Sequence, residues 1–374
     1  MNKGILRLAT AALSLALAGP LAACGASPSA WGALRGIGRT GALAVGDSGL
    51  QLYTMPDDGA APLLDAIQGA QKSIHLELYM LTTTNASGDL MQALIDKAKA
   101  GLDVRVMLDP HPYIPASAPK CQPSTMNINA KAFKALTAAG VMIKASNPRF
   151  VYTHEKGMVI DGTTAYIMTC NWTTSAFKKN REYVVADQNP QDVAEVDAIF
   201  EADWQSQPIA PSDPALVVSP DNSRAKILSL IDTATRSIAL ESEVFTDPEV
   251  ASHIAAKVQA GVDVKALLAF ERPTSCGDDL DGQETQIMQS SGITAFAFPK
   301  RLVMHAKAIV VDGTRAYVGS ENFSENSLDH NREMGLLVDD PAIVSALART
   351  VATDWTNNAG AQRVMPVIST DPVD

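Results

Sequence analysis

The chain has 374 residues, with 30 Lys and Arg against 41 Asp and Glu, a formal charge of −11 at pH 7, and 46% hydrophobic residues. At roughly 100–200 residues per domain, this length indicates two or three domains, and the composition excludes wholesale disorder, collagen and a small disulfide scaffold. The acidic balance also weighs against nucleic acid as a partner, because such binding relies on Lys and Arg that neutralise phosphates.

The first 23 residues have the pattern of a bacterial export signal. Lys3 and Arg7 precede an apolar run over residues 8–17, which is shorter than the ~20 residues that span a bilayer. Small residues then lead into Cys24, as in a lipobox, so we predict a lipoprotein signal peptide over residues 1–23 and a protein anchored in the cell envelope by lipidation of Cys24. An ordinary signal peptide, with Cys24 incidental and the protein secreted, is the alternative.

The chain after the signal begins with a tether and continues as two similar halves. Residues 24–45 are rich in Gly, Ala and Ser, which is typical of a flexible segment. Residues 63–77 recur 164 residues later as residues 227–241, and each copy has the pattern of an amphipathic helix running into a strand. In both halves the next helix ends at a Gly, Gly101 or Gly261, before an alternating strand.

Helices that alternate with strands indicate an α/β fold. We predict two similar α/β halves, over residues 46–207 and 215–374, each a mixed β-sheet flanked by helices. A linker near residues 207–222, punctuated by prolines such as Pro208 and Pro211, lies between them. We expect the halves to pack with pseudo-twofold symmetry and to form one active site at their interface.

Three cysteines remain after the signal and Cys24. Export implies an oxidising compartment, in which one disulfide and one free thiol can form. Cys121 with Cys276 is the favoured pair, because the two lie in comparable loops of the two halves, and Cys170 is the third thiol. No Cys and His cluster has the spacing of a zinc site, so we expect no metal.

Each half contains a His and a Lys two residues apart on a predicted strand. These pairs are His154 with Lys156 and His305 with Lys307. Side chains two residues apart project from the same face of a strand. We therefore expect an imidazole and an ammonium group to lie together in each half.

Each of these strands ends at an Asp-Gly pair, a strong signal for a hairpin turn. The pairs are Asp161-Gly162 and Asp312-Gly313. The returning strand then carries a hydroxyl and an amide two residues apart. These are Thr169 with Asn171 and Ser320 with Asn322. Each half thus places four kinds of polar group on two adjoining strands.

This set of groups suits a phosphodiester. Lys and Asn can bind its non-bridging oxygens and stabilise negative charge in the transition state, while imidazole can act as a nucleophile or proton donor. Both halves then repeat Asn-Arg-Glu, in which Glu182 and Glu333 each lie 28 residues after the His of the same half. A carboxylate bonded to Nδ1 would fix the tautomer of that ring and raise its basicity.

At this point the sequence resembles the phospholipase D superfamily. Its mark is His-x-Lys-x4-Asp followed by Gly-Ser-x-Asn, usually present twice in one chain, and the resemblance extends from about residue 48 to residue 358. The second half keeps the whole pattern. The first half has Met168-Thr169 where the family has Gly-Ser; Thr169 preserves the hydroxyl, and the bulkier Met168 could narrow the pocket beside it.

The resemblance implies a reaction that needs neither metal nor cofactor. One His, commonly that of the first half and here His154, attacks phosphorus to give a phosphohistidine, and His305 protonates the leaving alcohol. The residues that the resemblance assigns to the catalytic motif are His154, Lys156, Asp161, His305, Lys307 and Asp312, although the hairpin positions of the two Asp favour a structural role. Those expected at the phosphate are Asn171, Asn322, Thr169 and Ser320, together with both Lys. Glu182 and Glu333 are the expected histidine-orienting acids.

We therefore predict a phospholipase D-type hydrolase that releases phosphatidic acid and a free head-group alcohol from a glycerophospholipid. It would act as a monomer, with the phospholipid and the membrane as its partners. One alternative is a cardiolipin synthase-like phosphatidyltransferase, which uses the same residues but delivers the phosphatidyl group to an alcohol. A secreted nuclease of the same superfamily and a noncatalytic envelope protein that kept the motif are the others.

Overall fold

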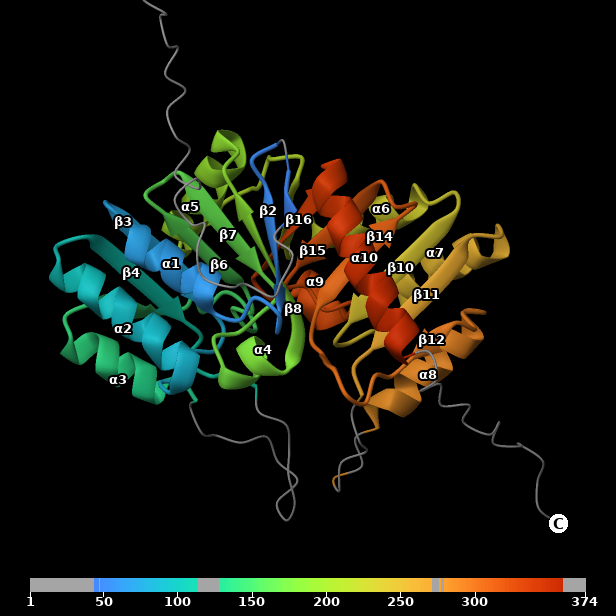
Figure 1. Cartoon of the computed structure of the whole chain (residues 1–374), viewed down its shortest axis with the longest axis horizontal. Helices are drawn as coiled ribbons and strands as arrows, with labels where there is room; N and C mark the ends of the chain where they lie inside the picture. The colour runs from blue at the N-terminus through green and yellow to red at the C-terminus, as the bar shows by residue number, and fades with distance from the viewer. Residues whose placement is uncertain (1–43, 47, 114–127, 271–275, 277–278, 359–374) are drawn as a thin grey trace, which may run out of the picture. The chain divides into compact units, whose positions relative to one another are not determined.

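The computed structural model describes residues 44–46, 48–113, 128–270, 276 and 279–358, all within one compact unit, Arg39–Asp374 (Figure 1). The predicted signal peptide, Cys24 and nearly all of the predicted tether lie outside the described residues. Within the described residues, no helix combines the length and the apolar character needed to cross a membrane.

The cysteines are described in part. Cys170 is a free thiol buried in the first core, and Cys276 is disulfide-bonded. Cys121 lies outside the described residues. The pairing of Cys121 with Cys276 therefore stays a prediction.

The first sheet is mixed and contains the strands of the first half. Its order is β1-β2-β8-β7-β6-β3-β4-β5, in which β3, β4 and β5 run parallel and all other neighbours antiparallel. The strands are β1 (Ala44–Val45), β2 (Gln51–Met55), β3 (Ser73–Leu78), β4 (Asp103–Leu108), β5 (Met142–Ala145), β6 (Lys156–Ile160), β7 (Thr164–Met168) and β8 (Asn180–Asp187). The helices are α1 (Ala61–Gly69), α2 (Asn85–Lys99), α3 (Ala130–Ala138), α4 (Thr174–Lys178) and α5 (Pro190–Trp204).

The second sheet repeats this arrangement, which confirms the predicted fold of two similar α/β halves. Its order is β12-β11-β10-β14-β15-β16-β9, again with three parallel strands, β10, β11 and β12. Its strands are β9 (Leu216–Ser219), β10 (Ser237–Ser242), β11 (Asp263–Leu268), β12 (Phe296–Ala297), β14 (Lys307–Val311), β15 (Arg315–Gly319) and β16 (Glu333–Val338). The short strand β13 (Val303–Met304) of the second half pairs instead with β8 of the first sheet. The helices are α6 (Ser223–Asp232), α7 (Pro248–Gln259), α8 (Leu280–Ser290), α9 (Glu325–Asp329) and α10 (Pro341–Asn358).

Local signals in the sequence set several of these boundaries. Gly101 after α2 and Gly261 after α7 have φ of +92° and +85°, the left-handed conformation expected of helix caps. The predicted hairpin turns form as well, with φ of +56° at Asp161 and +54° at Asp312. The predicted linker differs from the structure, because its residues Leu216–Ser219 form β9, a buried strand that pairs with β16.

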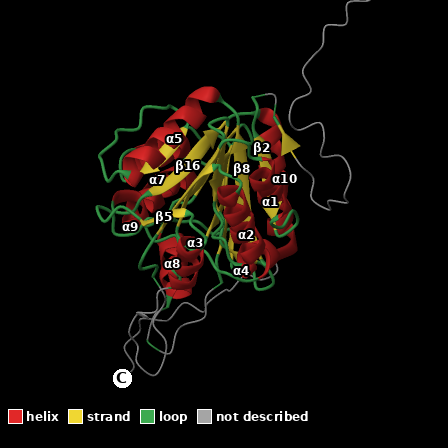
Figure 2. Ribbon diagram, turned by 90° about the vertical axis from the view of Figure 1, so that its left-hand side faces the viewer, coloured by secondary structure: helices red, strands yellow, loops and turns green. Residues whose placement is uncertain are grey.

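The two sheets pack face to face around a shared apolar core. Ile167 and Val185 of the first sheet and Val318 and Leu336 of the second are all buried in it, and α5 and α10 contribute to its edges (Figures 1 and 2). The opposite faces are covered by α1, α2 and α3 in the first half and by α6, α7 and α8 in the second. Burial of the shared core is what drives the two halves together.

Two buried arginines also connect the halves, and each belongs to an Asn-Arg-Glu repeat. Arg332 of the second half donates from Nε to Asp203 Oδ2 on α5, at 2.7 Å. Arg181 of the first half donates from Nε to Asp354 Oδ2 on α10, at 2.6 Å. Arg332 is fully buried and also donates to the Ser219 carbonyl oxygen at 3.0 Å, so its guanidinium is held from both halves.

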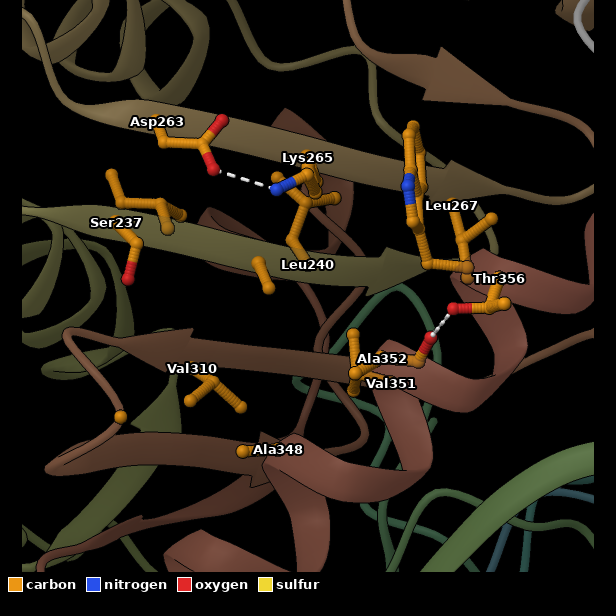
Figure 3. Close-up of a pocket in the computed structure, with 14 residues that line it drawn as sticks. Ser237, Leu240, Asp263, Lys265, Leu267, Val310, Ala348, Val351, Ala352 and Thr356 are labelled. Carbon is orange, nitrogen blue, oxygen red and sulfur yellow. Dashed lines mark hydrogen bonds and ion pairs between the residues drawn. The ribbon is translucent and has the colours of Figure 1, made fainter. Parts of the chain in front are cut away.

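The halves have diverged at a pocket between α10 and the strands β10, β11 and β14 (Figure 3). The pocket has a mainly apolar lining and a volume of about 370 Å³. The equivalent space in the first half is filled by His75, which stacks on Phe200 with ring centroids 4.9 Å apart, whereas the second half has Ala239 and Val351 at those positions. No described residue of the predicted site lines this pocket.

We predict that Arg332→Met lowers the free energy of unfolding by roughly 3–5 kcal/mol, because it leaves the buried carboxylate of Asp203 without its partner. Urea unfolding followed by circular dichroism would measure the change. The matched control is Arg349→Met on the exposed face of α10, where we expect a change of less than about 0.5 kcal/mol. Equal effects of the two substitutions would contradict the anchoring role of Arg332.

Candidate active site

Each predicted catalytic His is held by backbone contacts to the other half. His154 precedes β6, and its N–H donates to the carbonyl oxygen of Arg332 at 2.9 Å. In the second half, β13 pairs in parallel with the start of β8, and the N–H of His305 donates to the carbonyl oxygen of Arg181 at 3.4 Å. The segment before each His is therefore bonded to the Asn-Arg-Glu repeat of the opposite half.

As a result, the histidine–carboxylate pairs cross between the halves. His154 Nδ1 lies 2.7 Å from Glu333 Oε2, and His305 Nδ1 lies 2.9 Å from Glu182 Oε1. The spacing in the sequence suggested that each Glu would serve the His of its own half, and the structure exchanges the partners. Burial would raise the pKa of both Glu, but their His partners hold it below its usual value.

The carboxylates are oriented by a second layer of side chains. Asn180 Nδ2 donates to Glu182 Oε1 at 3.0 Å, and Thr169 Oγ1 donates to Glu182 Oε2 at 2.6 Å. Ser320 hydrogen-bonds Glu333 in the same way. Thr169 and Ser320 are fully buried, so both hydroxyls orient the acids instead of contacting phosphate. This placement corrects the predicted phosphate contact of these two residues.

The first-half departure from Gly-Ser has a structural explanation. Met168 is fully buried in the core of the first half, and so it does not narrow the site. In the second half a Cβ at Gly319 would collide with the Tyr317 hydroxyl and with Gly335, so only glycine fits there. The equivalent positions 168 and 319 are therefore packed differently in the two halves, by the Met168 side chain in the first and around a glycine in the second.

The two lysines lie beside their histidines. Lys156 is fully buried, and its Nζ donates to the carbonyl oxygen of His154. Burial lowers the pKa of Lys156 to about 8. Lys307 is equally buried and donates to the carbonyl oxygen of His305 at 2.7 Å. Each half thus places one lysine ammonium group at the backbone carbonyl of its histidine.

The remaining motif residues divide into two groups. Asn171 and Asn322 follow β7 and β15, are 7% and 9% exposed, and each has an Oδ1 without a hydrogen-bond partner among the described residues. Asp161 and Asp312 lie beyond the far ends of β6 and β14, about 16 Å along the strand from the lysines.

The two hairpin aspartates act on the backbone. Asp161 Oδ1 accepts from the N–H of Lys72 at 2.6 Å, and Asp312 Oδ1 accepts from the N–H of Arg236 at 2.7 Å. Each carboxylate therefore fastens its hairpin to the start of the neighbouring strand, β3 or β10. The structure assigns both Asp a structural role and corrects their inclusion among the catalytic residues.

The pseudosymmetry of the site is broken at the residue that follows β3 and β10. In the first half this residue is Tyr79, whose ring lies edge-on to His154 with centroids 4.5 Å apart. In the second half it is Glu243, whose Oε2 lies 2.5 Å from Lys307 Nζ and whose Oε1 lies 3.3 Å from His305 Nε2. No motif in the sequence predicts Glu243 as a site residue, although the internal repeat aligns it with Tyr79.

His154 has the more secluded environment of the two histidines. Burial, the largest effect, lowers the pKa of His154 below its usual value, and the Glu333 carboxylate only partly opposes this. This shift favours the neutral form of the His154 imidazole. His305 has the polar surroundings of Lys307 and Glu243 instead.

Comparisons with known proteins give consistent results. A family model described as "Cardiolipin synthase, PLD-like domain" matches residues 63–204 and 227–355. The chain is 23% identical over 356 residues to a cardiolipin synthase of Oceanobacillus iheyensis, covering 82% of this chain and 69% of that protein. It is 24% identical over 346 residues to the major cardiolipin synthase ClsA of Bacillus subtilis, with 82% and 69% covered.

Two solved structures show the same fold. Phosphatidylserine synthase of Haemophilus influenzae superposes with a TM-score of 0.61 at 14% identity, covering 84% of this chain and 86% of that one. Polyphosphate kinase of Porphyromonas gingivalis gives a TM-score of 0.61 at 15% identity, covering 82% and 47%. At these identities the likeness concerns the fold alone.

These matches correct two predictions. The relatives are synthases that transfer a phosphatidyl group, which overturns the prediction of a hydrolase. The relatives are also enzymes that make a membrane phospholipid, which overturns the prediction of an exported or secreted protein anchored through Cys24. Membership of the phospholipase D superfamily is confirmed.

We predict that Glu333→Gln lowers the pKa of His154 further, because it removes the negative charge that favours the imidazolium. An NMR titration of the His154 ring in the purified protein would measure the shift. The matched control is Glu182→Gln. Because Glu182 contacts His305, this substitution should leave the pKa of His154 unchanged. A larger effect of Glu182→Gln on His154 would contradict the crossed pairing.

Proposed function

The chain belongs to the family described as cardiolipin synthase, PLD-like domain, within the phospholipase D superfamily, and from this premise we propose that it is a phosphatidyltransferase that makes cardiolipin. The observation that carries the proposal is the pair of histidines, each bonded at Nδ1 to a buried carboxylate of the other half and each accompanied by a buried lysine. A phospholipid donor and an alcohol acceptor are the substrates.

In the first step, His154 Nε2 attacks the phosphorus of the donor phospholipid. A phosphorus–nitrogen bond forms, and the bond between phosphorus and the head-group oxygen breaks. His305 in its protonated form gives its Nε2 proton to the leaving alcohol. Its partner Glu182 stabilises the imidazolium until that proton leaves.

In the second step, the hydroxyl of a second phospholipid head group, such as that of phosphatidylglycerol, attacks the phosphohistidine. Its proton passes to His305 Nε2, a phosphorus–oxygen bond forms and the phosphorus–nitrogen bond breaks. The products are cardiolipin and free His154. Because His305 is returned to its protonated form, the site is ready for another donor.

The charge that builds on the phosphoryl oxygens during both steps needs fixed donors. Lys156 and Lys307 are placed next to the two histidines, and Asn171 and Asn322 follow the ends of the returning strands β7 and β15. We assign these four residues to binding the non-bridging oxygens. Their burial strengthens such interactions, because little water screens them.

The assignment of His154 as nucleophile rests on the asymmetry between the two histidines. Burial and the Tyr79 ring keep His154 neutral and sheltered from water, as a nucleophile requires. His305 lies beside charged groups on the side where alcohols would leave and enter. A sheltered phosphohistidine also survives longer before water reaches it.

We predict that His154→Ala and His305→Ala each reduce cardiolipin formation at least about 10³-fold, because neither step can proceed without both imidazoles. Vesicles of phosphatidylglycerol, with cardiolipin and released glycerol measured by mass spectrometry, provide the assay. His253→Ala is the matched control, since His253 on α7 is a surface residue paired with Asp232. Cardiolipin formation by either active-site variant at the wild-type rate would overturn the two-histidine scheme.

A further inference from the structure

One carboxylate lies where the proposed reaction would bind an anion. Glu243 follows β10 and contacts both His305 Nε2 and Lys307 Nζ, at 3.3 and 2.5 Å. Its negative charge opposes the approach of a phosphodiester, so a carboxylate at this position weakens donor binding. The crossed acids Glu182 and Glu333 already orient the histidines, so Glu243 is not needed for that purpose.

Glu243 is both fixed and accessible. Oε2 is held by Lys307, which is fully buried, while the Glu243 side chain is 23% exposed. Burial would raise the pKa of Glu243, but His305 and Lys307 hold it far below its usual value, so the group is ionised. Glu243 Oε1 is therefore a fixed, negatively charged hydrogen-bond acceptor. It lies beside His305 Nε2, the nitrogen that exchanges protons with alcohols in the proposed reaction.

The equivalent position near the other histidine offers no such acceptor. The Tyr79 ring covers His154, and its hydroxyl oxygen is occupied by the backbone N–H of Tyr113, which donates to it at 2.6 Å. Lys156 Nζ lies 5.3 Å from the centre of the same ring. The site thus has an apolar side at His154 and a side at His305 that can bind hydroxyl groups.

We propose that Glu243 is a specificity-determining residue that binds a hydroxyl of the acceptor alcohol and so favours a polyol over water in the second step. The inference rests on the proposed function. One hydroxyl of a glycerol head group gives its proton to His305 Nε2 as it attacks phosphorus. The neighbouring hydroxyl donates a hydrogen bond to Glu243 Oε1, and Glu243 keeps its charge throughout.

The geometry fits insertion of a hydroxyl at this point. The 3.3 Å separation of Glu243 Oε1 and His305 Nε2 is longer than the ~2.7–2.9 Å of a strong charge-assisted hydrogen bond. A vicinal diol can replace this loose contact with one hydroxyl at each group. A water molecule that attacks phosphorus has to contact Glu243 through the attacking oxygen itself, whereas a diol supplies a separate hydroxyl for that contact, so Glu243 favours the diol.

The test is the partition of product between transfer and hydrolysis. Purified full-length chain acts on phosphatidylglycerol vesicles, and cardiolipin and phosphatidic acid are measured for the wild type, Glu243→Gln and Glu243→Ala. We expect the ratio of cardiolipin to phosphatidic acid to fall roughly tenfold or more in Glu243→Ala, as for loss of a hydrogen bond to a charged group, and less in Glu243→Gln, which keeps an oxygen acceptor. The first step, measured as head group released in a single turnover, should stay level or rise, because a repulsive charge is removed.

A second readout separates recognition of the acceptor from a merely structural effect. Added glycerol and 1-propanol compete as acceptors, and the wild type should favour glycerol, whereas Glu243→Ala should lose that preference. Glu249→Gln, on the exposed start of α7, is the matched control and should behave as the wild type.

The possible outcomes distinguish this inference from the proposed function. An unchanged ratio and an unchanged glycerol preference in both variants would overturn the role of Glu243 and leave the transferase proposal standing. Loss of head-group release in a single turnover of both variants would overturn it as well, because the first step does not use Glu243. If the wild type forms no phosphatidyl product from these vesicles, the proposed function itself fails.

Discussion

The site depends on the exchange of backbone contacts between the two halves. The segment before each histidine is bonded to the Asn-Arg-Glu repeat of the opposite half, which places His154 against Glu333 and His305 against Glu182. Both glutamates are completely buried, and a buried carboxylate without a partner is strongly unfavourable. Each half supplies hydrogen bonds to its own acid, but the imidazole partner of that acid comes from the other half, so the site requires both.

The Asn-Arg-Glu repeat combines three tasks in three consecutive residues. In the second half Asn331 donates to Glu333, Arg332 reaches across to Asp203, and Glu333 reaches across to His154. Neighbouring residues of a strand point to opposite faces, so one short segment can bind two different partners at once. The repeat thus connects the two halves through Arg332 and orients the imidazole of His154 through Glu333.

Duplication gave the site two equal sets of groups, and later differences gave them unequal surroundings. The exchange of Tyr79 for Glu243 makes one histidine sheltered and the other polar, which suits a reaction whose two imidazoles have different tasks. The exchange of His75 for Ala239 instead opens a pocket at the other end of the second sheet, which no described site residue lines. The difference between Tyr79 and Glu243 changes the surroundings of the two histidines. The difference between His75 and Ala239 changes the packing against α10.

The features that depend on neighbouring residues could be predicted from the amino-acid sequence alone. The Asp-Gly pairs specified the hairpins, and the matched segments gave the two similar sheets. Only the tertiary structure decided which carboxylate serves which histidine, because that pairing joins residues 154 and 333, far apart in the chain, and a regular spacing within each half cannot reveal it. It also decided that the hydroxyls of Thr169 and Ser320 bind acids, and that Glu243 lies in the site, since both facts follow from how side chains of separate strands meet in a buried interface.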